Sequence, residues 1–178
     1  MEPESAQIRE RLEKLQERLA AAAARAGRTA EEITLVGVTK RFPPAVIRAA
    51  YAAGVRHIGE NRAQELAAKQ PELEDLPITW HMVGHLQSNK INKVLGRIQL
   101  LQSLDRASLA EALQKRLTAP LDCLVEVNTA GEASKSGVEP AGLPRLLDRI
   151  AACDRLRVRG LMTVGPLTDD TGRIRAAF

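Results

Sequence analysis

Aromatic residues are almost absent from this sequence, at 2% of its 178 residues. Proteins that bind single-stranded nucleic acid stack the bases on aromatic side chains, and this chain has few to offer. The formal net charge of +4 weakly favours anionic ligands, but the basic residues are interspersed with acidic ones, which is typical of a solvated surface. We therefore expect no role in binding nucleic acid.

Cysteines and long apolar runs are scarce as well. Cys123 and Cys153 are too far apart to form a metal-binding or redox motif, and Cys123 lies in an apolar run, where we expect it to pack as a small hydrophobic residue. There is no run of about 18 apolar residues, and the N-terminus is acidic, unlike that of a signal peptide. We therefore expect a cytoplasmic protein without membrane contact.

The sequence does contain a regular alternation of short apolar runs and longer segments with helical spacing. Apolar residues recur at steps of three and four over residues 4–26, which predicts an amphipathic N-terminal helix. The predicted strands are 33–38, 55–59, 78–83, 97–101, 121–127 and 156–162. The predicted helices are 44–53, 62–74, one around 91–95, 107–117, 140–151 and a last one beginning near Asp170. With 44% hydrophobic residues, we expect residues 1–178 to form a single domain.

Six repeats of about 25 residues, each a strand and a helix, predict parallel strands joined by right-handed crossovers. No glycine-rich dinucleotide fingerprint follows the first strand, which argues against a Rossmann fold. A TIM-type (β/α) barrel fits better, although such barrels have eight strands and about 250 residues. The expected fold is therefore an α/β barrel with about six of its eight units and an extra N-terminal helix.

Polar and small residues follow the predicted strands one after another. In a parallel barrel the carboxyl ends of the strands meet at one rim, where ligand-binding and catalytic residues gather. The segments at these ends are Thr39-Lys40, residues 59–62, residues 81–90, Gln102-Ser103, Asn128 and Met162-Thr163. Their coincidence predicts a binding site on the rim.

Lys40 is the most informative of these residues. A lysine that directly follows a buried β-branched strand loses part of its hydration, and this favours the neutral amine that a Schiff base requires. Taken alone, Lys40 fits an ordinary surface lysine past a strand end at least as well. The other rim residues favour the functional interpretation.

Two further groups of residues are weaker signals. His81 and His85 are four apart but straddle a strand end, and His57 belongs to another strand, so no metal site is expected. Residues 134–137 form a small polar loop whose backbone amides and Lys135 are compatible with phosphate binding, or with any exposed loop.

Five linked segments make the sequence resemble the YggS/PROSC family of pyridoxal 5′-phosphate (PLP) homeostasis proteins. In chain order they are VGVTKRFP, HIGENRAQE, WHMVGHLQSNK, VNTAGEASKSG and RGLMTV, all within residues 33–165. The resemblance implies a PLP fold-type III barrel, similar to the N-terminal domain of alanine racemase. It also implies PLP as the cofactor, held by Lys40 as a Schiff base.

The resemblance implies the other cofactor-binding residues too. Asn61 matches the asparagine of the GENR motif, and Met162 matches the methionine of the GLM motif. Met82 and Gly84 belong to the WHMVGHLQ motif, which lines the pocket in relatives. Lys135 matches a lysine of the SKSG loop and is expected to act in the exchange or regulation of PLP.

Relatives in this family continue further at the C-terminus, with a serine motif and an Arg-Ile-Gly motif that supply most of the phosphate cradle. Neither motif occurs here, so we expect a C-terminally truncated barrel. Such an open barrel would leave strand edges exposed.

Three functions remain in competition. We favour a monomeric PLP homeostasis protein that catalyses no reaction and exchanges PLP with PLP-dependent apoenzymes, so no catalytic residue is assigned. A racemase needs a second proton donor opposite the lysine, and the only tyrosine, Tyr51, lies in a predicted helix away from the rim. The third alternative is a basic protein that acts only through interactions, but the sequence contains no recognised nucleic-acid-binding module.

Overall fold

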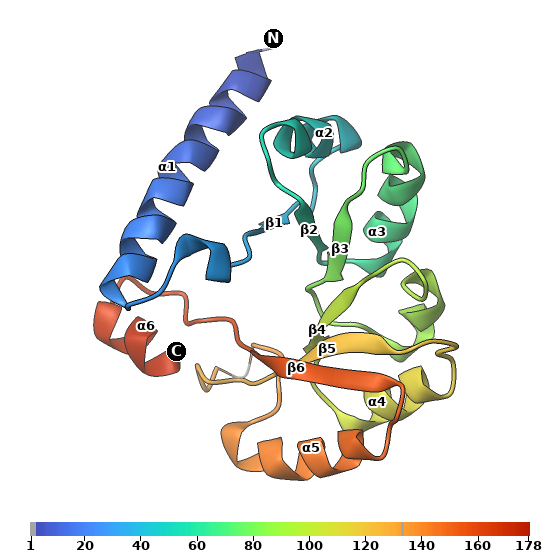
Figure 1. The fold of residues 1–178 in the computed structure, drawn as a ribbon. Helices are drawn as coiled ribbons and strands as arrows, with labels where there is room; N and C mark the ends of the chain where they lie inside the picture. Colours follow the sequence, from blue (N-terminus) through green and yellow to red (C-terminus); the bar gives the residue numbers. More distant parts are fainter. Residues whose placement is uncertain (1–2, 133) are drawn as a thin grey trace.

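The computed structural model describes residues 3–132 and 134–178. Its centre is a six-stranded, parallel sheet in the order β1-β2-β3-β4-β5-β6 (Figure 1). The strands are β1 (Val36–Val38), β2 (His57–Glu60), β3 (Thr79–Met82), β4 (Leu100–Leu104), β5 (Leu121–Glu126) and β6 (Leu156–Met162). The predicted parallel α/β architecture is confirmed.

Helical segments connect the strands. The α-helices are α1 (Pro3–Arg25), α2 (Pro44–Ala52), α3 (Ala63–Lys69), α4 (Ala107–Gln114), α5 (Leu143–Ala151) and α6 (Thr171–Ala177). Short 3-10 helices occupy Ala30–Glu32, Gln70–Leu73, Ser88–Lys93 and Pro140–Gly142. Figure 1 shows α2 to α5 along the outside of the curved sheet, whereas α1 and α6 lie away from α3 and α4. The predicted N-terminal helix is present and packs beside α2.

Several elements are shorter than predicted, and two differences affect the rim. Strand β4 begins at Leu100 rather than Arg97, because the Arg97 amide instead donates to the Val94 carbonyl and closes the preceding turn. Gln102 and Ser103 therefore lie inside β4 and not after it. The segment after β3 is a 3-10 helix rather than an α-helix, since an apolar spacing of three residues suits both.

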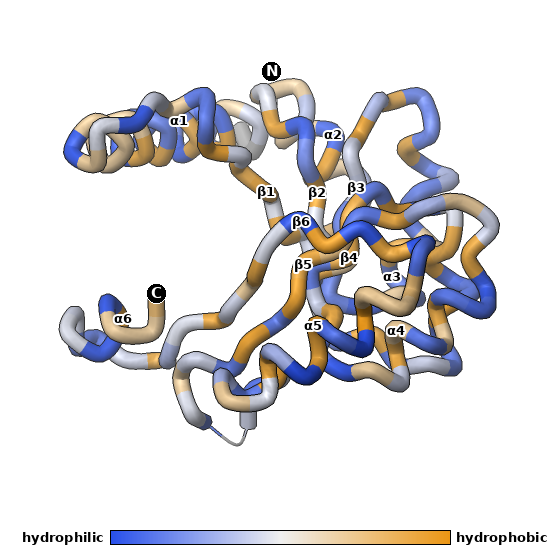
Figure 2. Tube along the Cα trace, turned by 60° about the horizontal axis from the view of Figure 1, so that its bottom comes forward, coloured by the Kyte–Doolittle hydropathy of each residue, from blue (hydrophilic) through white to orange (hydrophobic). Residues whose placement is uncertain are grey.

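Side chains of the strands alternate between the helix layer and the barrel interior. The helix-facing residues form the hydrophobic core, and they include Ile58, Trp80, Leu101 and Cys123. Figure 2 shows strongly hydrophobic residues gathered along the strands. Burial raises the pKa of the Cys123 thiol to about 12, so Cys123 packs as the expected small hydrophobic residue and is chemically inert.

The sheet does not close into a barrel. Within the described residues, β1 pairs with β2 alone and β6 with β5 alone. Apolar side chains are exposed on both of these strands, with Val38 at 42%, Val158 at 40% and Leu161 at 57%. The six-unit, open architecture expected from the sequence is therefore confirmed. In the part of the chain that the structure describes, no helix is both long and apolar enough to cross a membrane.

Candidate functional site

Near the rim, the interior of the open barrel has an apolar surface made by valines. Gly59 faces this interior, because a Cβ placed on it would lie 2.7 Å from Val83 Cγ2, 3.2 Å from Val36 Cγ1 and 3.5 Å from Val38 Cγ2. We call these three valines, gathered around Gly59, the valine floor. A side chain at position 59 would fill the space between them, so glycine keeps the floor flat.

Lys40 follows the valine floor directly. The ladder between β1 and β2 continues through Thr39, whose amide donates to the Gly59 carbonyl. The Thr39 hydroxyl points to the helix layer, where it donates to Glu60 Oε1 at 2.7 Å. By alternation, Lys40 follows Val36 and Val38 on the interior side. The sequence thus predicted the place of Lys40 at the end of a strand correctly.

The expected loss of hydration at Lys40 is wrong for this chain. Its side chain is exposed, as are those of Val38 and Arg41 beside it. The physical reason is that β1 is an edge strand of an open sheet, so no neighbouring strand covers Lys40 on that side. Water therefore reaches the amine from the unpaired edge.

The backbone on both sides of Lys40 is held by α3. Lys69 Nζ donates to the Thr39 carbonyl at 2.9 Å, and the Arg41 amide donates to Glu65 Oε2 at 3.0 Å. Arg41 has φ = 67°, a left-handed conformation that residues with a Cβ rarely adopt. Sequence reasoning missed these α3 residues, because a glutamate and a lysine four apart on a helix usually form a surface pair.

Asn61 and Gly84 lie side by side at the ends of β2 and β3. A Cβ on Gly84 would lie 2.3 Å from the Asn61 carbonyl oxygen, so only glycine lets the two loops approach this closely. The Ser103 hydroxyl donates to the Gly84 carbonyl at 2.7 Å and ties the pair to β4. Gly84 therefore acts by bringing Asn61 to the rim.

The two methionines predicted for the site lie in different surroundings. Met82 is 1% exposed and belongs to the hydrophobic core between sheet and helices, so its side chain does not line the rim as expected. The alternation of β3 explains this correction, because Met82 is one residue out of phase with the interior-facing Val83. Met162 is half-buried at the end of β6, in register with Glu126.

Lys135 lies in the loop after β5. Its side chain is half-buried, and Nζ donates to the Gly165 carbonyl at 3.4 Å. This bond joins the loop to the segment that follows β6. The structure thus places Lys40, Asn61 and Gly84 on the β1–β3 part of the rim, and Lys135 and Met162 on the β5–β6 part.

Glu126 is a buried acid on the β5 part of the rim that sequence reasoning overlooked. Its side chain is 4% exposed, and its Oε2 atom has no hydrogen-bond partner among the described residues. Burial, assisted by the negative charge of Asp105, raises the pKa of the Glu126 carboxyl to about 7. The sequence signal that could have revealed this residue is an acid near the end of the predicted apolar strand 121–127.

Below the rim, the open interior is polar. His57 Nδ1 lies 3.0 Å from His81 Nε2, and His81 Nδ1 lies 2.9 Å from the Gln102 side-chain nitrogen. Burial, with a smaller effect of the His57 charge, lowers the pKa of His81 to about 4 and keeps it neutral at pH 7. The sequence argument separated His57 from His81 because they lie on different strands, but those strands are adjacent. No cluster of three or more potential metal ligands occurs within residues 3–132 and 134–178.

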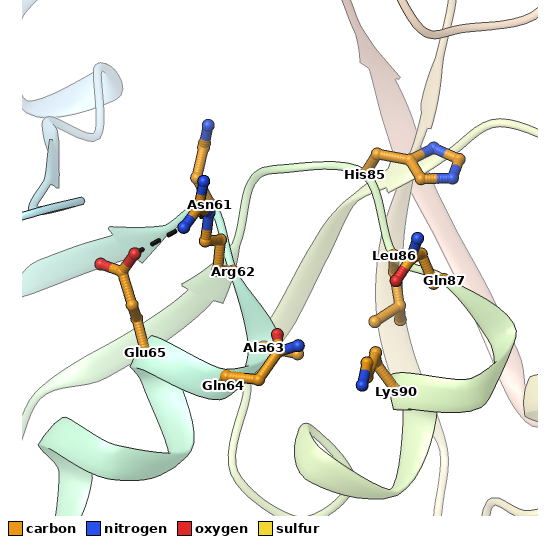
Figure 3. Close-up of a pocket in the computed structure, with 9 residues that line it drawn as sticks. All are labelled: Asn61, Arg62, Ala63, Gln64, Glu65, His85, Leu86, Gln87 and Lys90. Carbon is orange, nitrogen blue, oxygen red and sulfur yellow. Dashed lines mark ion pairs between the residues drawn. The ribbon is translucent and has the colours of Figure 1, made fainter.

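A cavity of about 440 Å³ lies beside the rim, between the loops after β2 and β3 (Figure 3). Arg62 and Glu65 form an ion pair at 4.0 Å on one side of it, and His85 Nδ1 lies 2.9 Å from Asp105 Oδ2 on the other. Every lining residue comes from two of the segments noted in the sequence, HIGENRAQE and WHMVGHLQSNK. They are Asn61, Arg62, Ala63, Gln64, Glu65, His85, Leu86, Gln87 and Lys90.

Comparison with known proteins gives consistent results. The family described as "Alanine racemase, N-terminal domain" matches residues 10–177. A pyridoxal phosphate homeostasis protein of Aquifex aeolicus is 41% identical over 172 residues, which are 95% of this chain and 75% of that protein.

Solved structures agree with these sequence matches. An unknown protein from Bifidobacterium adolescentis superposes with a TM-score of 0.93 at 36% identity, covering 99% of this chain and 77% of that one. PipY of Synechococcus elongatus, solved with PLP bound, superposes with a TM-score of 0.79 at 36% identity, covering 95% of this chain and 76% of PipY.

Proposed function

The chain belongs to the alanine racemase N-terminal domain family, and we propose that it binds PLP at Lys40 and serves PLP homeostasis without catalysing a reaction of its own. The PLP-bound structure of PipY and the name of the Aquifex aeolicus relative support the choice of cofactor. The observation that carries the proposal is the position of Lys40, whose amine stands directly beyond the partly exposed valine floor.

The residues of the β1–β3 rim fit this cofactor. PLP is a flat aromatic anion, and the valine floor offers an apolar surface, of which Val38 is 42% exposed. When bound, PLP supplies an aldehyde, which condenses with a primary amine. Lys40 is such an amine, it is exposed to incoming ligand, and it lies on the interior side of the rim.

The other rim residues have proposed roles that follow from their places. Asn61, held against Gly84, offers a polar side chain beside the floor. Met162 and Lys135 approach from the β5–β6 part, and we propose that Met162 packs on the ligand while Lys135 acts in its exchange. Arg41 and Lys135 also give the rim a positive charge, which favours an anionic ligand.

The absence of turnover is part of the proposal. Racemisation of an amino acid requires a proton donor on each face of the cofactor. Tyr51 lies in α2, packs against the hydrophobic core and has the Arg56 guanidinium 4.1 Å above its ring, so it does not reach the rim. We propose PLP-dependent apoenzymes as the recipients of the cofactor.

Borohydride reduction after incubation with PLP tests the proposal. We expect the chain to turn yellow, the reduced product to carry one PLP, and peptide mapping to place it on Lys40. Lys40→Ala should remove the visible absorption band, whereas Lys115→Ala, which deletes an exposed lysine at the end of α4, should leave it unchanged. A full-strength band in Lys40→Ala would contradict the proposal.

A separate measurement tests the lack of catalysis. The PLP-loaded chain is incubated with L-alanine or L-serine, and the D-enantiomer is measured by chiral chromatography. We expect none above the level of free PLP. Racemisation that disappears in Lys40→Ala would instead identify the chain as an enzyme.

A further inference from the structure

We propose that Lys69 and Glu65 of α3 are positioning residues for Lys40, which fix the two peptide groups that flank it and so direct its side chain to the barrel interior. This inference rests on the proposed function, because it assigns these residues a role in presenting the amine to PLP. It concerns the chain's own geometry and can therefore be tested with and without PLP.

Lys69 is a buried ammonium group with a complete set of partners. It is 8% exposed, and its Nζ donates to the Thr39 carbonyl at 2.9 Å, Glu60 Oε1 at 2.7 Å and Glu65 Oε2 at 3.3 Å. An ammonium has three donors, and all three are used. We call Lys69 and these three acceptor residues the Lys69 network. A lysine is rarely buried unless it is paired in this way.

Glu65 extends the Lys69 network to the other side of Lys40. Its Oε2 atom accepts from both Lys69 Nζ and the Arg41 amide, the latter at 3.0 Å. The Arg41 amide is also the largest cause of a lowered pKa of the Glu65 carboxyl, which marks this contact as a stabilising one. The peptide groups before and after Lys40 are thus both bound to groups on α3.

The conformation of Arg41 shows what this arrangement does. Its φ of 67° lies in the left-handed region, which residues with a Cβ occupy only where surrounding contacts hold them. Without the Glu65 contact, the chain after Lys40 would relax toward a common conformation. The direction of the Lys40 side chain would change with it, because an exposed side chain has little packing of its own to hold it.

A purely structural role is the competing explanation, since the buried pair of Lys69 and Glu60 also stabilises the fold. The two roles differ in which contact matters. Stability depends mainly on the fully buried Glu60, whereas the geometry after Lys40 depends on the Arg41 contact of the partly exposed Glu65. Glu65 is therefore the better residue to vary.

Glu65→Ala tests the positioning role without breaking the buried pair. We expect the Kd for PLP to rise about tenfold and the Arg41 amide to lose its protection from hydrogen exchange in the PLP-free chain. Glu74→Ala is the matched control, because it removes the same charge from an exposed position just after α3 and its 3-10 extension. Glu74→Ala should change neither quantity.

Glycine at position 41 separates positioning from general stability. Glycine adopts positive φ readily, so it needs the Glu65 contact less. In an Arg41→Gly background, the effect of Glu65→Ala on the Kd should therefore shrink from about tenfold to about threefold. A purely structural role of Glu65 would not depend on the residue at position 41, and the effect would stay the same.

The outcomes for this inference and for the proposed function can be told apart. If the unmodified chain binds PLP and Glu65→Ala binds it equally well, the positioning role is overturned. If the unmodified chain fails to bind PLP, the proposed function is overturned instead. In that case the exchange rate of the Arg41 amide still tests the contact with Glu65, because it is measured on the protein alone.

Discussion

The β1–β3 part of the rim and the β5–β6 part are held in opposite ways. β1 has three residues, yet the rim beyond it is fixed by the Lys69 network, in which Lys69 and Glu65 belong to α3. β6 has seven residues, yet Met162 leads into a loop. The neighbouring loop is joined to that loop by a hydrogen bond from Lys135 to the Gly165 carbonyl and by one between two threonine hydroxyls. The precision of a rim residue therefore depends on side chains from the helix layer and not on the length of its strand.

The two buried acids at strand ends show the same contrast. Glu60 ends β2, is fully buried and has both Lys69 and the Thr39 hydroxyl on Oε1. Glu126 ends β5 and is 4% exposed, and it forms no ion pair with the described residues, whereas Oε2 of both acids has no hydrogen-bond partner among them. One acid is compensated by a cation, and the other is compensated by taking up a proton, because its pKa is raised to about 7.

Removing the cation beside Glu60 should have the largest effect on stability. Lys69→Met leaves the buried Glu60 without its cation, which costs about 3–5 kcal/mol in the free energy of unfolding. Lys135→Met, the corresponding change on the other part of the rim, should cost less than about 1 kcal/mol because its side chain is only half-buried. Urea denaturation of both variants measures the difference. Similar losses in the two would show that the two parts of the rim are held alike.

Replacing the buried carboxyl of Glu126 should stabilise the fold, by an amount that depends on pH. Because the folded pKa of Glu126 lies above its usual value of 4.5, the folded chain binds the extra proton, and stability falls as pH rises from about 4.5 through 7. Glu126→Gln cannot ionise, so it should raise the free energy of unfolding by about 2 kcal/mol at pH 8 and change it little at pH 4.

Urea unfolding at several pH values between 4 and 8 checks this prediction for Glu126. Asp122→Asn is a suitable control, because that acid lies on the same strand but is paired with Arg159 at 2.9 Å. It should not reproduce the gain at high pH. A gain from Glu126→Gln that is the same at pH 4 and pH 8 would contradict the assigned ionisation.

The two parts of the rim also differ in how closely their loops pack, and the surroundings of one glycine on each part show this difference. At Gly84 a Cβ would meet the Asn61 backbone at 2.3 Å, and backbone cannot move aside cheaply. At Gly165 a Cβ would meet the ring of Phe178 at 2.9 Å, but that ring is 80% exposed and can swing away. We expect Gly84→Ala to cost about 2 kcal/mol by thermal denaturation and Gly165→Ala less than about 0.5. Equal shifts in Tm would contradict this.

Local pattern predicted one part of the molecule well. The bounds of β6 are those expected, and α6 begins after Asp170, whose carboxylate accepts from the amides of Gly172 and Arg173 as an N-cap. These features depend on neighbouring residues alone. Lys40 could likewise be placed at the end of its strand, because a β-branched run followed by polar residues marks that point.

The residues around Lys40 could not be predicted, because they depend on tertiary packing. Glu65 and Lys69 are four residues apart on a helix, and this spacing predicts an ion pair on the solvated surface. Their burial depends on Glu60 from another strand, and the exposure of Lys40 depends on the unpaired edge of β1. Met82 was assigned to the rim from the motif resemblance alone, and the alternation of β3 places its side chain on the helix-facing side instead.

The smallest expected effect concerns the strain beside Lys40. Arg41→Gly removes the steric cost of positive φ, about 1 kcal/mol, but glycine also makes the unfolded chain more flexible, so the net gain in the free energy of unfolding should be below about 1 kcal/mol. Arg28→Gly is the control, since its position just after α1 has no positive φ and the change should not stabilise the chain. If Arg41→Gly instead destabilises the chain by more than about 1 kcal/mol, the arginine side chain and not the backbone contact to Glu65 holds this turn.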